Sequence, residues 1–397
     1  MTADVAIVGA SAGGLAVAEG LRRRGFTGSL ALIDAEAGLP YDRPPLSKEV
    51  LDGRWPARRA RLRERAALDA LDADWHPGLP AVSLDVPGHR LTLRDGTVLG
   101  YRTLVVATGL RARRLPGSGR LAGVHTLRTL ADSRRLRSDL LTARAVVVVG
   151  AGVLGCEIAA TARGLGRDVT LVEPAAQPMT RVLGAELGSA AAGLHTENGV
   201  RLLTSTSVAA LVGEQGRVVG VRTSTGAVLP ADVVVVAIGA EPATDWLTGS
   251  GLTLDDGVVC DDRCRAAHDV YAVGDVARVG VGDGRGSRLE NRTNATEQGL
   301  FVSAAILGLD RGPYRPVPYM WSDQYRVRIQ LYGEVPDKAA VRVVEGSVAE
   351  RRFVAHAEAG GRLVGVVGWN SPGPTRTARA LLAASESAPQ CSLRGEK

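Results

Sequence analysis

The sequence predicts an α/β chain that contains the same βαβ unit twice, followed by a smaller α+β unit. Apolar runs at residues 4–9 and 145–150 each break into a glycine-rich turn and a helical pattern, about 140 residues apart. From about residue 315 the composition shifts to alternating, aromatic-rich segments. With 397 residues, 45% of them apolar, and 49 Gly, the chain is long enough for two or three domains joined by tight turns.

The first βαβ unit begins with DVAIVG, a short apolar run typical of a buried parallel strand. Small residues form the turn that follows: Gly9, Ser11, Gly13 and Gly14. A helix with a basic C-terminal end comes next, and the strand LALIDAE then ends in Asp34 and Glu36. The N–H groups of such a turn bind a pyrophosphate and the acid binds a ribose hydroxyl, so this unit predicts a dinucleotide site.

The stretch at residues 40–50, PYDRPPLSKEV, predicts a stiff arm. The ring of Pro45 should hold Pro44 in an extended conformation, so that a helix can begin only from Leu46. Lys48 then lies on the first helical turn. A stiff arm that aims one cation suits a redox cofactor, but a proline-rich surface loop explains these residues equally well.

Two segments follow the arm. Residues 54–68 predict a basic helix, either a solvated face or part of a docking surface. Residues 81–109 alternate with period two and contain Asp95-Gly96, which predicts a hairpin turn. The buried strand LVVATG closes this segment at Gly109, which brings its backbone to the edge of the sheet where ligands bind.

The second βαβ unit spans residues 144–173 and has the complete glycine pattern. Its glycines are Gly150, Gly152 and Gly155. Glu157 lies just inside the helix and Glu173 ends the next strand. An acid at that strand end accepts ribose hydroxyls and repels a 2′-phosphate, which favours NADH over NADPH, although Arg181 works against that preference.

The remaining segments predict support and a further ligand contact. Residues 200–240 predict a small antiparallel meander followed by a buried strand, and residues 290–305 a helix. Gly274-Asp275 ends a strand, where the acid either contacts a ligand or caps the next helix. A hairpin with a Gly-Gly turn and a closing helix complete the C-terminal unit, and the last ten residues are expected to be disordered.

Composition excludes several classes of function. Of the 48 basic residues 45 are Arg, since Lys occurs only at 48, 338 and 397, and no aromatic-interleaved basic stripe indicates nucleic-acid binding. The four cysteines form no CxxC pair, so neither a metal site nor a redox dithiol is expected. We expect no signal peptide and no membrane span, because the first strand starts by Asp4 and no apolar run approaches the ~20 residues needed. The expected location is cytoplasmic.

Six motifs together resemble the FAD-dependent NADH:ferredoxin reductases of bacterial oxygenases, a family related to apoptosis-inducing factor. They are PYDRPPLSK at 40–48, ATG at 107–109, LRTLAD at 127–132, GAGVLGCE at 150–157, YAVGDVA at 271–277 and WSDQY at 321–325. The resemblance covers nearly the whole chain. It implies two Rossmann-like domains of the glutathione-reductase type plus a C-terminal α+β domain. The implied domains are 1–109 with 232–314 for FAD, 110–231 for NADH and 315–390 at the C-terminus, with 391–397 as a disordered tail.

The resemblance also implies the site residues. The turn at Gly9, Ser11, Gly13 and Gly14 would hold the FAD pyrophosphate, with Asp34 or Glu36 on the adenosine ribose, although relatives carry this acid at the place of Ala35. Further FAD contacts would come from Arg43, Lys48, Val82, Ala107, Thr108, Gly109, Arg128, Gly274, Asp275, Glu290, Ala295 and Trp321. The NADH contacts would be Gly150, Gly152, Gly155, Glu157 and Glu173.

The implied reaction is hydride transfer from NADH to the flavin, followed by single-electron transfer to an acidic 2Fe–2S ferredoxin that binds transiently. Lys48, Glu157 and Trp321 would be the catalytic residues, Lys48 beside the flavin with Glu157 as its ion partner, and Trp321 at the electron exit. The chain would be a monomer or a weak homodimer. Relatives usually carry an aromatic residue near Arg292, a departure that bears on partner choice.

Three rival functions share this plan. A disulfide reductase or NADH oxidase would need a redox cysteine after the first βαβ unit, and residues 1–155 contain none. A tailoring flavoenzyme that oxidises a small metabolite stays open. So does an NADH-sensing interaction protein, which would oxidise NADH slowly and without an acceptor.

Overall fold

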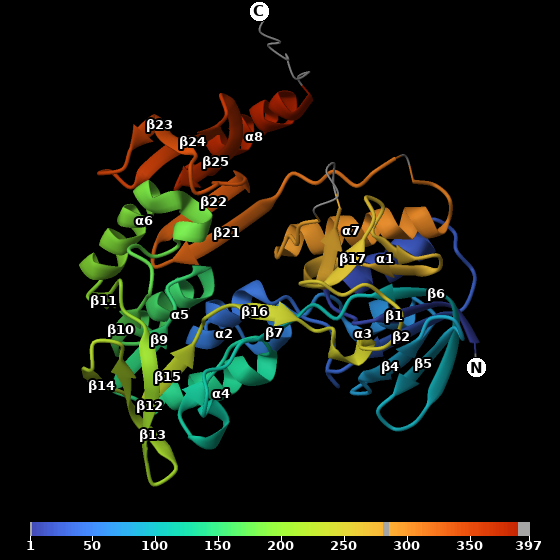
Figure 1. Ribbon diagram of the computed structural model, residues 1–397, viewed down its shortest axis with the longest axis horizontal. Coiled ribbons are helices and arrows are strands. Elements are labelled where there is room, and N and C mark those ends of the chain that lie inside the picture. The colour runs from blue at the N-terminus through green and yellow to red at the C-terminus, as the bar shows by residue number, and fades with distance from the viewer. Residues whose placement is uncertain (1, 281–285, 311, 388–397) are drawn as a thin grey trace, which may run out of the picture. The chain divides into compact units, whose positions relative to one another are not determined.

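The computed structural model describes residues 2–280, 286–310 and 312–387 (Figure 1). The chain divides into two compact units, Met1–Thr142 with Val235–Pro316, and Ala143–Val234 with Val317–Lys397. The domain boundaries expected from the sequence stay predictions. The tail expected to be disordered, residues 388–397, lies outside the described residues.

The first unit is built on a sheet with the strand order β18-β19-β6-β1-β2-β3. Its strands are β1 (Thr2–Val8), β2 (Leu30–Asp34), β3 (Ala73–Pro77), β6 (Val98–Val106), β18 (Arg265–Ala267) and β19 (Val270–Ala272). β1 pairs in parallel with β2 and β6, as the apolar runs predict for strands buried on both faces. Ile7, Ile33 and Leu104 at its centre are fully buried.

Helix α1 (Ala12–Arg23) joins β1 to β2 and lies beside α7 (Arg292–Ile306) (Figure 1). The two helices cross closely because glycines meet at the contact. A Cβ on Gly299 would lie 2.4 Å from the carbonyl oxygen of Gly13, and a Cβ on Gly13 would lie 3.2 Å from that of Ala295. The crossing therefore fixes the start of α7 beside the start of α1.

The predicted hairpin at Asp95-Gly96 is confirmed. β4 (Ala81–Asp85), β5 (Arg90–Leu93) and β6 pair antiparallel in sequence, and Gly96 has φ 89°. Shorter elements complete the unit: β7 (Leu110–Ala112), β8 (Val124–His125), α4 (Leu130–Thr142), β16 (Ala240–Pro242), β17 (Val258–Cys260) and β20 (Ala277–Val279).

The extended conformation expected at Pro44 is wrong. Pro44–Ser47 form a 3₁₀ turn, and Lys48 lies between it and α2 (Glu49–Asp52). Leu46 N donates to Arg43 O at 2.9 Å and Lys48 N to Pro45 O at 3.1 Å. The two prolines occupy the first positions of the turn, where a missing N–H costs no hydrogen bond.

The single basic helix expected at residues 54–68 is also wrong. Two short helices stand there, a 3₁₀ turn (Ala57–Ala60) and α3 (Arg65–Asp69). Arg61 between them is extended and forms a β-bridge with Tyr41, and Leu62 N donates to Pro40 O at 2.8 Å. Pairing with the arm thus overrides helical propensity at this point.

The second unit repeats the first arrangement. β9 (Ala145–Val149), α5 (Val153–Gly164), β10 (Asp168–Val172), α6 (Thr180–Glu197) and β11 (Arg201–Leu203) alternate, and the strands pair in parallel as β11-β10-β9. The antiparallel meander expected over residues 200–240 is therefore correct only for β12 (Val208–Glu214), β13 (Arg217–Thr223) and β14 (Val228–Pro230). The buried strand β15 (Val233–Val236) follows them.

The C-terminal segment of the second unit forms a five-stranded antiparallel sheet in the order β21-β22-β25-β24-β23. Its strands are β21 (Tyr319–Gln324), β22 (Val327–Gly333), β23 (Ala340–Ser347), β24 (Arg352–Ala359) and β25 (Arg362–Trp369). Helix α8 (Pro372–Ser387) packs on β25 and β22 (Figure 1). β21 packs against α5, which brings the WSDQY segment to the helix that carries Glu157.

Candidate functional site

The glycine-rich turn of the first unit is shaped by close backbone contacts. Gly9 has φ 107°, and a Cβ there would lie 2.3 Å from Ala107 O. A Cβ on Gly14 would lie 1.9 Å from Gly9 O. Only glycine fits at these two positions, so the sequence pattern reports real steric demands. The turn leads into α1, and the side chain of Ser11 at its start is not used as a cap.

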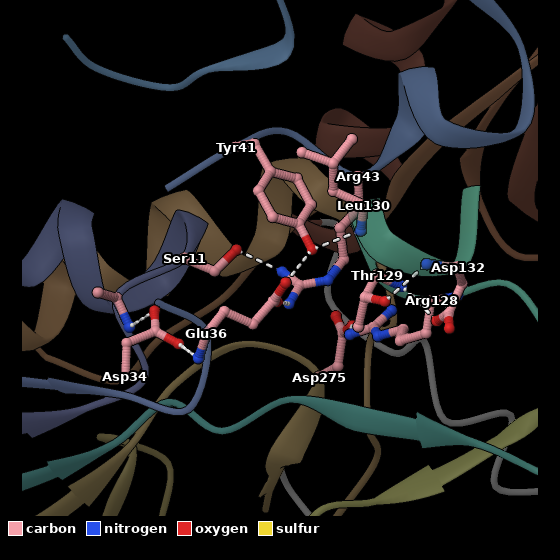
Figure 2. A network of polar contacts seen from close by, with 11 residues as sticks. Ser11, Asp34, Glu36, Tyr41, Arg43, Arg128, Thr129, Leu130, Asp132 and Asp275 are labelled. Carbon is pink, nitrogen blue, oxygen red and sulfur yellow. Dashed lines mark hydrogen bonds and ion pairs between the residues drawn. The ribbon is translucent and has the colours of Figure 1, made fainter. Parts of the chain in front are cut away.

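The acid at the end of β2, Asp34, is hydrogen-bonded to the backbone of this turn. The Asp34 carboxylate accepts hydrogen bonds from Ala10 N at 3.0 Å and from Glu36 N at 2.9 Å (Figure 2). Burial raises the pKa of Asp34, and the two backbone donors act in the opposite direction. Asp34 is therefore held rigidly at the carboxyl end of β2.

The second unit has the same arrangement. Glu173 follows β10 and accepts from Ala151 N at 2.6 Å and from Ala175 N at 2.9 Å. Gly150 has φ 97°, and Gly152 would meet no atom within 4 Å if it carried a Cβ. Asp34 is thus the counterpart of Glu173 in position and in bonding. This geometry supports Asp34 rather than Glu36 as the ribose acid of the first unit.

Glu36 instead belongs to a second network, which Figure 2 shows. Its carboxylate accepts from Tyr41 Oη at 2.5 Å and pairs with Arg43 Nη2 at 3.4 Å. Arg43 also donates to the Ser11 hydroxyl, and Leu130 N donates to Tyr41 Oη at 2.9 Å. The arm is therefore tied to the glycine turn and to the start of α4.

The LRTLAD segment forms a capping box at the start of α4. Asp132 N donates to the Thr129 hydroxyl at 3.1 Å, and the Asp132 carboxylate accepts from Thr129 N at 2.9 Å and from Arg128 N at 3.2 Å (Figure 2). Together with Tyr41, these bonds satisfy amides that a helix start leaves without partners. They also fix the backbone that carries the Arg128 guanidinium.

Arg128 forms an ion pair with Asp275, the acid of the YAVGDVA motif that was predicted to contact a ligand. Its Nη2 lies 3.0 Å from Asp275 Oδ2, and burial lowers the pKa of Arg128, with the nearby Arg43 charge adding to the effect. Asp275 lies in a 3₁₀ turn, Gly274–Val276, and is not the cap of a longer helix. Gly274 has φ 74° and donates from its N to the buried Gln298 amide at 2.6 Å.

Two guanidinium nitrogens in this region fit a bound anion. Arg43 Nε and Arg128 Nε are buried and have no hydrogen-bond partner among the residues that the structure describes. A buried charged donor without a partner is costly. Both belong to side chains that converge on the glycine turn and on Asp275 (Figure 2). A pyrophosphate carried by a dinucleotide would supply the missing acceptors.

The strand-end residues 107–109 close the site on another side. Ala107 N donates to Val8 O at 2.7 Å, and the Thr108 hydroxyl donates to Ala243 O at 2.9 Å. Gly109 has φ 66°, and a Cβ there would lie 3.1 Å from Arg128 Nη2. A cavity of about 240 Å³ opens beside Ala10 and is lined partly by Trp75.

The other predicted residues lie as follows. Val82 is on β4 with 44% of its surface exposed. Glu290 pairs with Arg288 at 2.7 Å, and Ala295 lies on α7, 3.4 Å from the position that a Cβ on Gly274 would take. Arg292 pairs with Asp42 at 2.5 Å and so ties the arm to α7.

The predicted catalytic residues belong to different units. Lys48, which is 7% exposed, lies in the first, and Glu157 and Trp321 lie in the second. Trp321 is partly exposed on β21 and stacks on Tyr319 with ring centroids 5.8 Å apart. The ion pair between Lys48 and Glu157 stays a prediction, as does the place of Trp321 at the electron exit.

Sequence reasoning missed three residues of the site. Tyr41 and Asp132 stand inside motifs that were recognised, and the spacing of Thr129 and Asp132 matches a capping box. No sequence signal pointed to Gln298, because a Gln in a helical segment is common and its partner, Gly274 N, lies 24 residues away in the sequence. Within residues 2–280, 286–310 and 312–387, no helix combines the length and apolar composition of a membrane span, and no cluster of acids, cysteines and histidines could hold a metal ion.

Comparison with known proteins gives consistent matches over both units. The family model described as pyridine nucleotide-disulphide oxidoreductase matches residues 3–299, and the one described as reductase C-terminal matches residues 319–396. Rhodocoxin reductase of Rhodococcus erythropolis is 37% identical over 96% of this chain and 89% of its own length. The benzene 1,2-dioxygenase system ferredoxin–NAD(+) reductase subunit of Pseudomonas putida is 36% identical over 94% and 90%.

A solved structure agrees with these relatives. The covalent complex of putidaredoxin reductase with putidaredoxin contains a chain that superimposes with a TM-score of 0.92 at 31% identity. The match covers 96% of this chain and 93% of that one. The expected fold, two dinucleotide-binding domains with a C-terminal domain, is confirmed by this match together with the two family models.

Proposed function

Because the chain belongs to the pyridine nucleotide-disulphide oxidoreductase family, we propose that it is the flavoprotein that passes electrons from NADH through FAD to a ferredoxin. Relatives that cover nearly its whole length are named ferredoxin–NAD(+) reductases of oxygenase systems. The family, the reaction from NADH to ferredoxin and the cofactors FAD and NADH, all expected from the sequence, agree with these relatives. The ferredoxin is its electron acceptor, and an oxygenase consumes the electrons.

The main observation behind the proposal is that each unit has a strand-end acid bound to the backbone of a glycine-rich turn. Asp34 and Glu173 each accept two backbone N–H groups beside a glycine-rich turn. One chain thus offers two dinucleotide sites, as transfer between two nucleotides requires. The buried guanidinium nitrogens of Arg43 and Arg128 support FAD as the ligand of the first site, and Glu173 suits the unphosphorylated ribose of NADH.

Bound FAD supplies the redox chemistry, accepting a hydride and releasing electrons one at a time. The protein binds and orients. Arg43 and Arg128 would hold the pyrophosphate, Asp34 the adenosine ribose, and Asp275 hydroxyls of the ribityl chain. Lys48 would stabilise the negative charge that develops on reduction, and Trp321 would lie where electrons leave. Glu157 and the glycines at 150, 152 and 155 hold NADH.

The cysteine distribution argues against a disulfide reductase built on the same plan. The first cysteine in the chain is Cys156, which is fully buried on α5, and burial raises the pKa of its thiol. A thiol so placed is a poor nucleophile. The family name therefore describes the ancestry of the fold, and the acceptor is a protein partner instead of a disulfide.

We further propose that the ferredoxin is acidic and binds transiently, that the chain works as a monomer or weak homodimer, and that it acts in the cytoplasm. The net charge of +6 favours an acidic partner. Attraction of this kind weakens with salt, so the rate of ferredoxin reduction should fall between about 0.05 M and 0.5 M ionic strength. A rate indifferent to salt would contradict the acidic docking partner while leaving the reaction itself intact.

Steady-state turnover tests the function directly. The FAD-loaded protein is mixed with NADH, with and without a 2Fe–2S ferredoxin, and NADH oxidation is followed by absorbance. Oxidation that depends on ferredoxin supports the reductase. Slow oxidation that ferredoxin does not accelerate would instead indicate an NADH sensor, and ferredoxin-independent turnover with a small metabolite would indicate a tailoring enzyme.

A further inference from the structure

A chain of hydrogen bonds inside the second unit ends on the carboxylate of Glu157. The Ser322 hydroxyl donates to Glu157 Oε1 at 2.8 Å, and Gln324 Nε2 donates to the Ser322 hydroxyl at 3.1 Å. His195 Nε2 lies 3.1 Å from Gln324 Oε1, and Tyr325 Oη lies 3.0 Å from His195 Nδ1. Ser322, Gln324 and His195 are completely buried, and Glu157 is 5% exposed.

The bonding pattern fixes the direction of every proton in this chain. The Gln324 amide nitrogen faces Ser322 and also Met179 Sδ at 3.2 Å, so its oxygen faces His195. His195 Nε2 must then carry a proton. Burial lowers the pKa of His195 to about 4, so the ring holds a single proton at neutral pH and Nδ1 accepts from Tyr325. All donors therefore point towards Glu157.

Donors aligned in series strengthen one another, and a carboxylate is the natural end point of such a series. The Ser322 hydroxyl on Oε1 also fixes the rotation of the carboxylate plane. The side-chain amide of Gln324 interrupts proton hopping, because an amide does not readily pass on a proton. The chain of residues is therefore built to orient Glu157 and is not a proton exit.

We propose that Ser322, Gln324 and His195 are positioning residues that hold Glu157 for the nicotinamide end of the dinucleotide. This deepens the proposed function and rests on it. The three residues come from β21 and α6, whereas Glu157 lies on α5, so the C-terminal segment completes the nucleotide site of its own unit. A motif recognised only by resemblance, WSDQY, thereby acquires a physical role.

The test compares two ligands on the FAD-loaded protein by titration calorimetry. NAD+ and ADP-ribose share the adenosine, the pyrophosphate and the second ribose, but ADP-ribose lacks the nicotinamide. Ser322→Ala should weaken NAD+ about tenfold, the loss of one hydrogen bond to a charged group, and ADP-ribose less than twofold. Ser322→Thr, which keeps the hydroxyl, should restore NAD+ binding.

A second variant tests the same bond from the neighbouring side chain. Gln324→Glu keeps the volume of the side chain, but its carboxylate draws the Ser322 proton away from Glu157, so it should weaken NAD+ selectively as well. Thr375→Val is the matched control, because it removes another completely buried hydroxyl of the same unit, which donates to Ser371 O at 2.5 Å. It should leave the ratio of the two affinities unchanged.

Equal weakening of both ligands by Ser322→Ala, or no weakening of either, would overturn the positioning role. Failure of the proposed function looks different. In that case the unaltered protein itself would bind neither NAD+ nor ADP-ribose, and the inference would fall with it.

Discussion

Tyr41→Phe tests whether the arm is held in place by the contacts seen in the site. The phenol hydroxyl of Tyr41 donates to Glu36 at 2.5 Å and accepts from Leu130 N at 2.9 Å. Phenylalanine keeps the ring, which is 7% exposed, and keeps the Arg43 guanidinium over its face at 5.7 Å. The substitution therefore removes two hydrogen bonds and creates almost no cavity.

The expected loss follows from these two bonds. The bond to the Glu36 carboxylate is charge-assisted, but this side chain is 32% exposed, so its loss costs about 1–1.5 kcal/mol. Leaving Leu130 N at the start of α4 without its partner costs about 1 kcal/mol more. The free energy of unfolding of the first unit should therefore fall by about 2–2.5 kcal/mol.

Urea unfolding of the FAD-loaded protein measures this change. The two units can unfold separately, so each transition is fitted on its own. Tyr319→Phe is the matched control, because it removes a phenol hydroxyl of the second unit that accepts from Gln330 Nε2 at 2.8 Å, a neutral partner. The control should cost about 1 kcal/mol or less and should not affect the transition of the first unit.

A loss below about 0.5 kcal/mol for Tyr41→Phe would contradict the role of its hydroxyl, because that is the effect of an ordinary surface substitution. A loss that appears only in the transition of the second unit would refute it too. Either result would mean that the Tyr41 hydroxyl does not hold the arm and that its other contacts, such as the pair of Arg292 with Asp42, suffice.

Three further outcomes are expected. Glu173→Ala should lower kcat/KM for NADH about tenfold or more while that for NADPH falls less or rises, measured side by side, because the variant loses the ribose acceptor and the repulsion of a 2′-phosphate. Lys48→Met should slow NADH-dependent bleaching of the flavin by at least about tenfold in stopped flow, with little change in NAD+ affinity; an unchanged rate would remove Lys48 from the catalytic residues. Burial lowers the pKa of His195 to about 4, so the free energy of unfolding of the second unit should fall as the pH drops from ~6.5 towards 4 and the buried ring must take up a proton. His195→Gln should remove this pH dependence, which amounts to up to about 3 kcal/mol. Urea unfolding at a series of pH values measures the difference.

Local pattern was enough to predict the two βαβ units and the positions where only glycine fits. The clash that a Cβ would make at Gly9 or Gly14 is with backbone a few residues away or on the neighbouring strand, and every chain with this turn meets it. The hairpin at Asp95-Gly96 is local in the same sense. Such features depend on short-range sterics, which residue types reveal directly.

Elements that depend on distant partners were predicted wrongly. The residues around Arg61 leave a helical path because they pair with the arm near Tyr41 and Pro40. β11 joins the parallel sheet beside β10 and not the meander that follows it. In both places the local pattern, helical near Arg61 and alternating at β11, predicted a different structure, because pairing with a distant segment determines the one that forms.

Residue types alone were enough to predict two nucleotide turns, each followed by an acid at a strand end, and a cation in the arm. Three features became visible only in the folded chain: Asp34 is the acid that binds the turn, Tyr41 joins the arm to α4, and Gln298 holds the loop of Asp275. The two kinds of feature differ in the distance along the chain over which their interactions act. Backbone sterics act between neighbours, whereas Tyr41 and Leu130 are 89 residues apart, and a hydrogen bond exists only where the fold brings its donor and acceptor within about 3 Å.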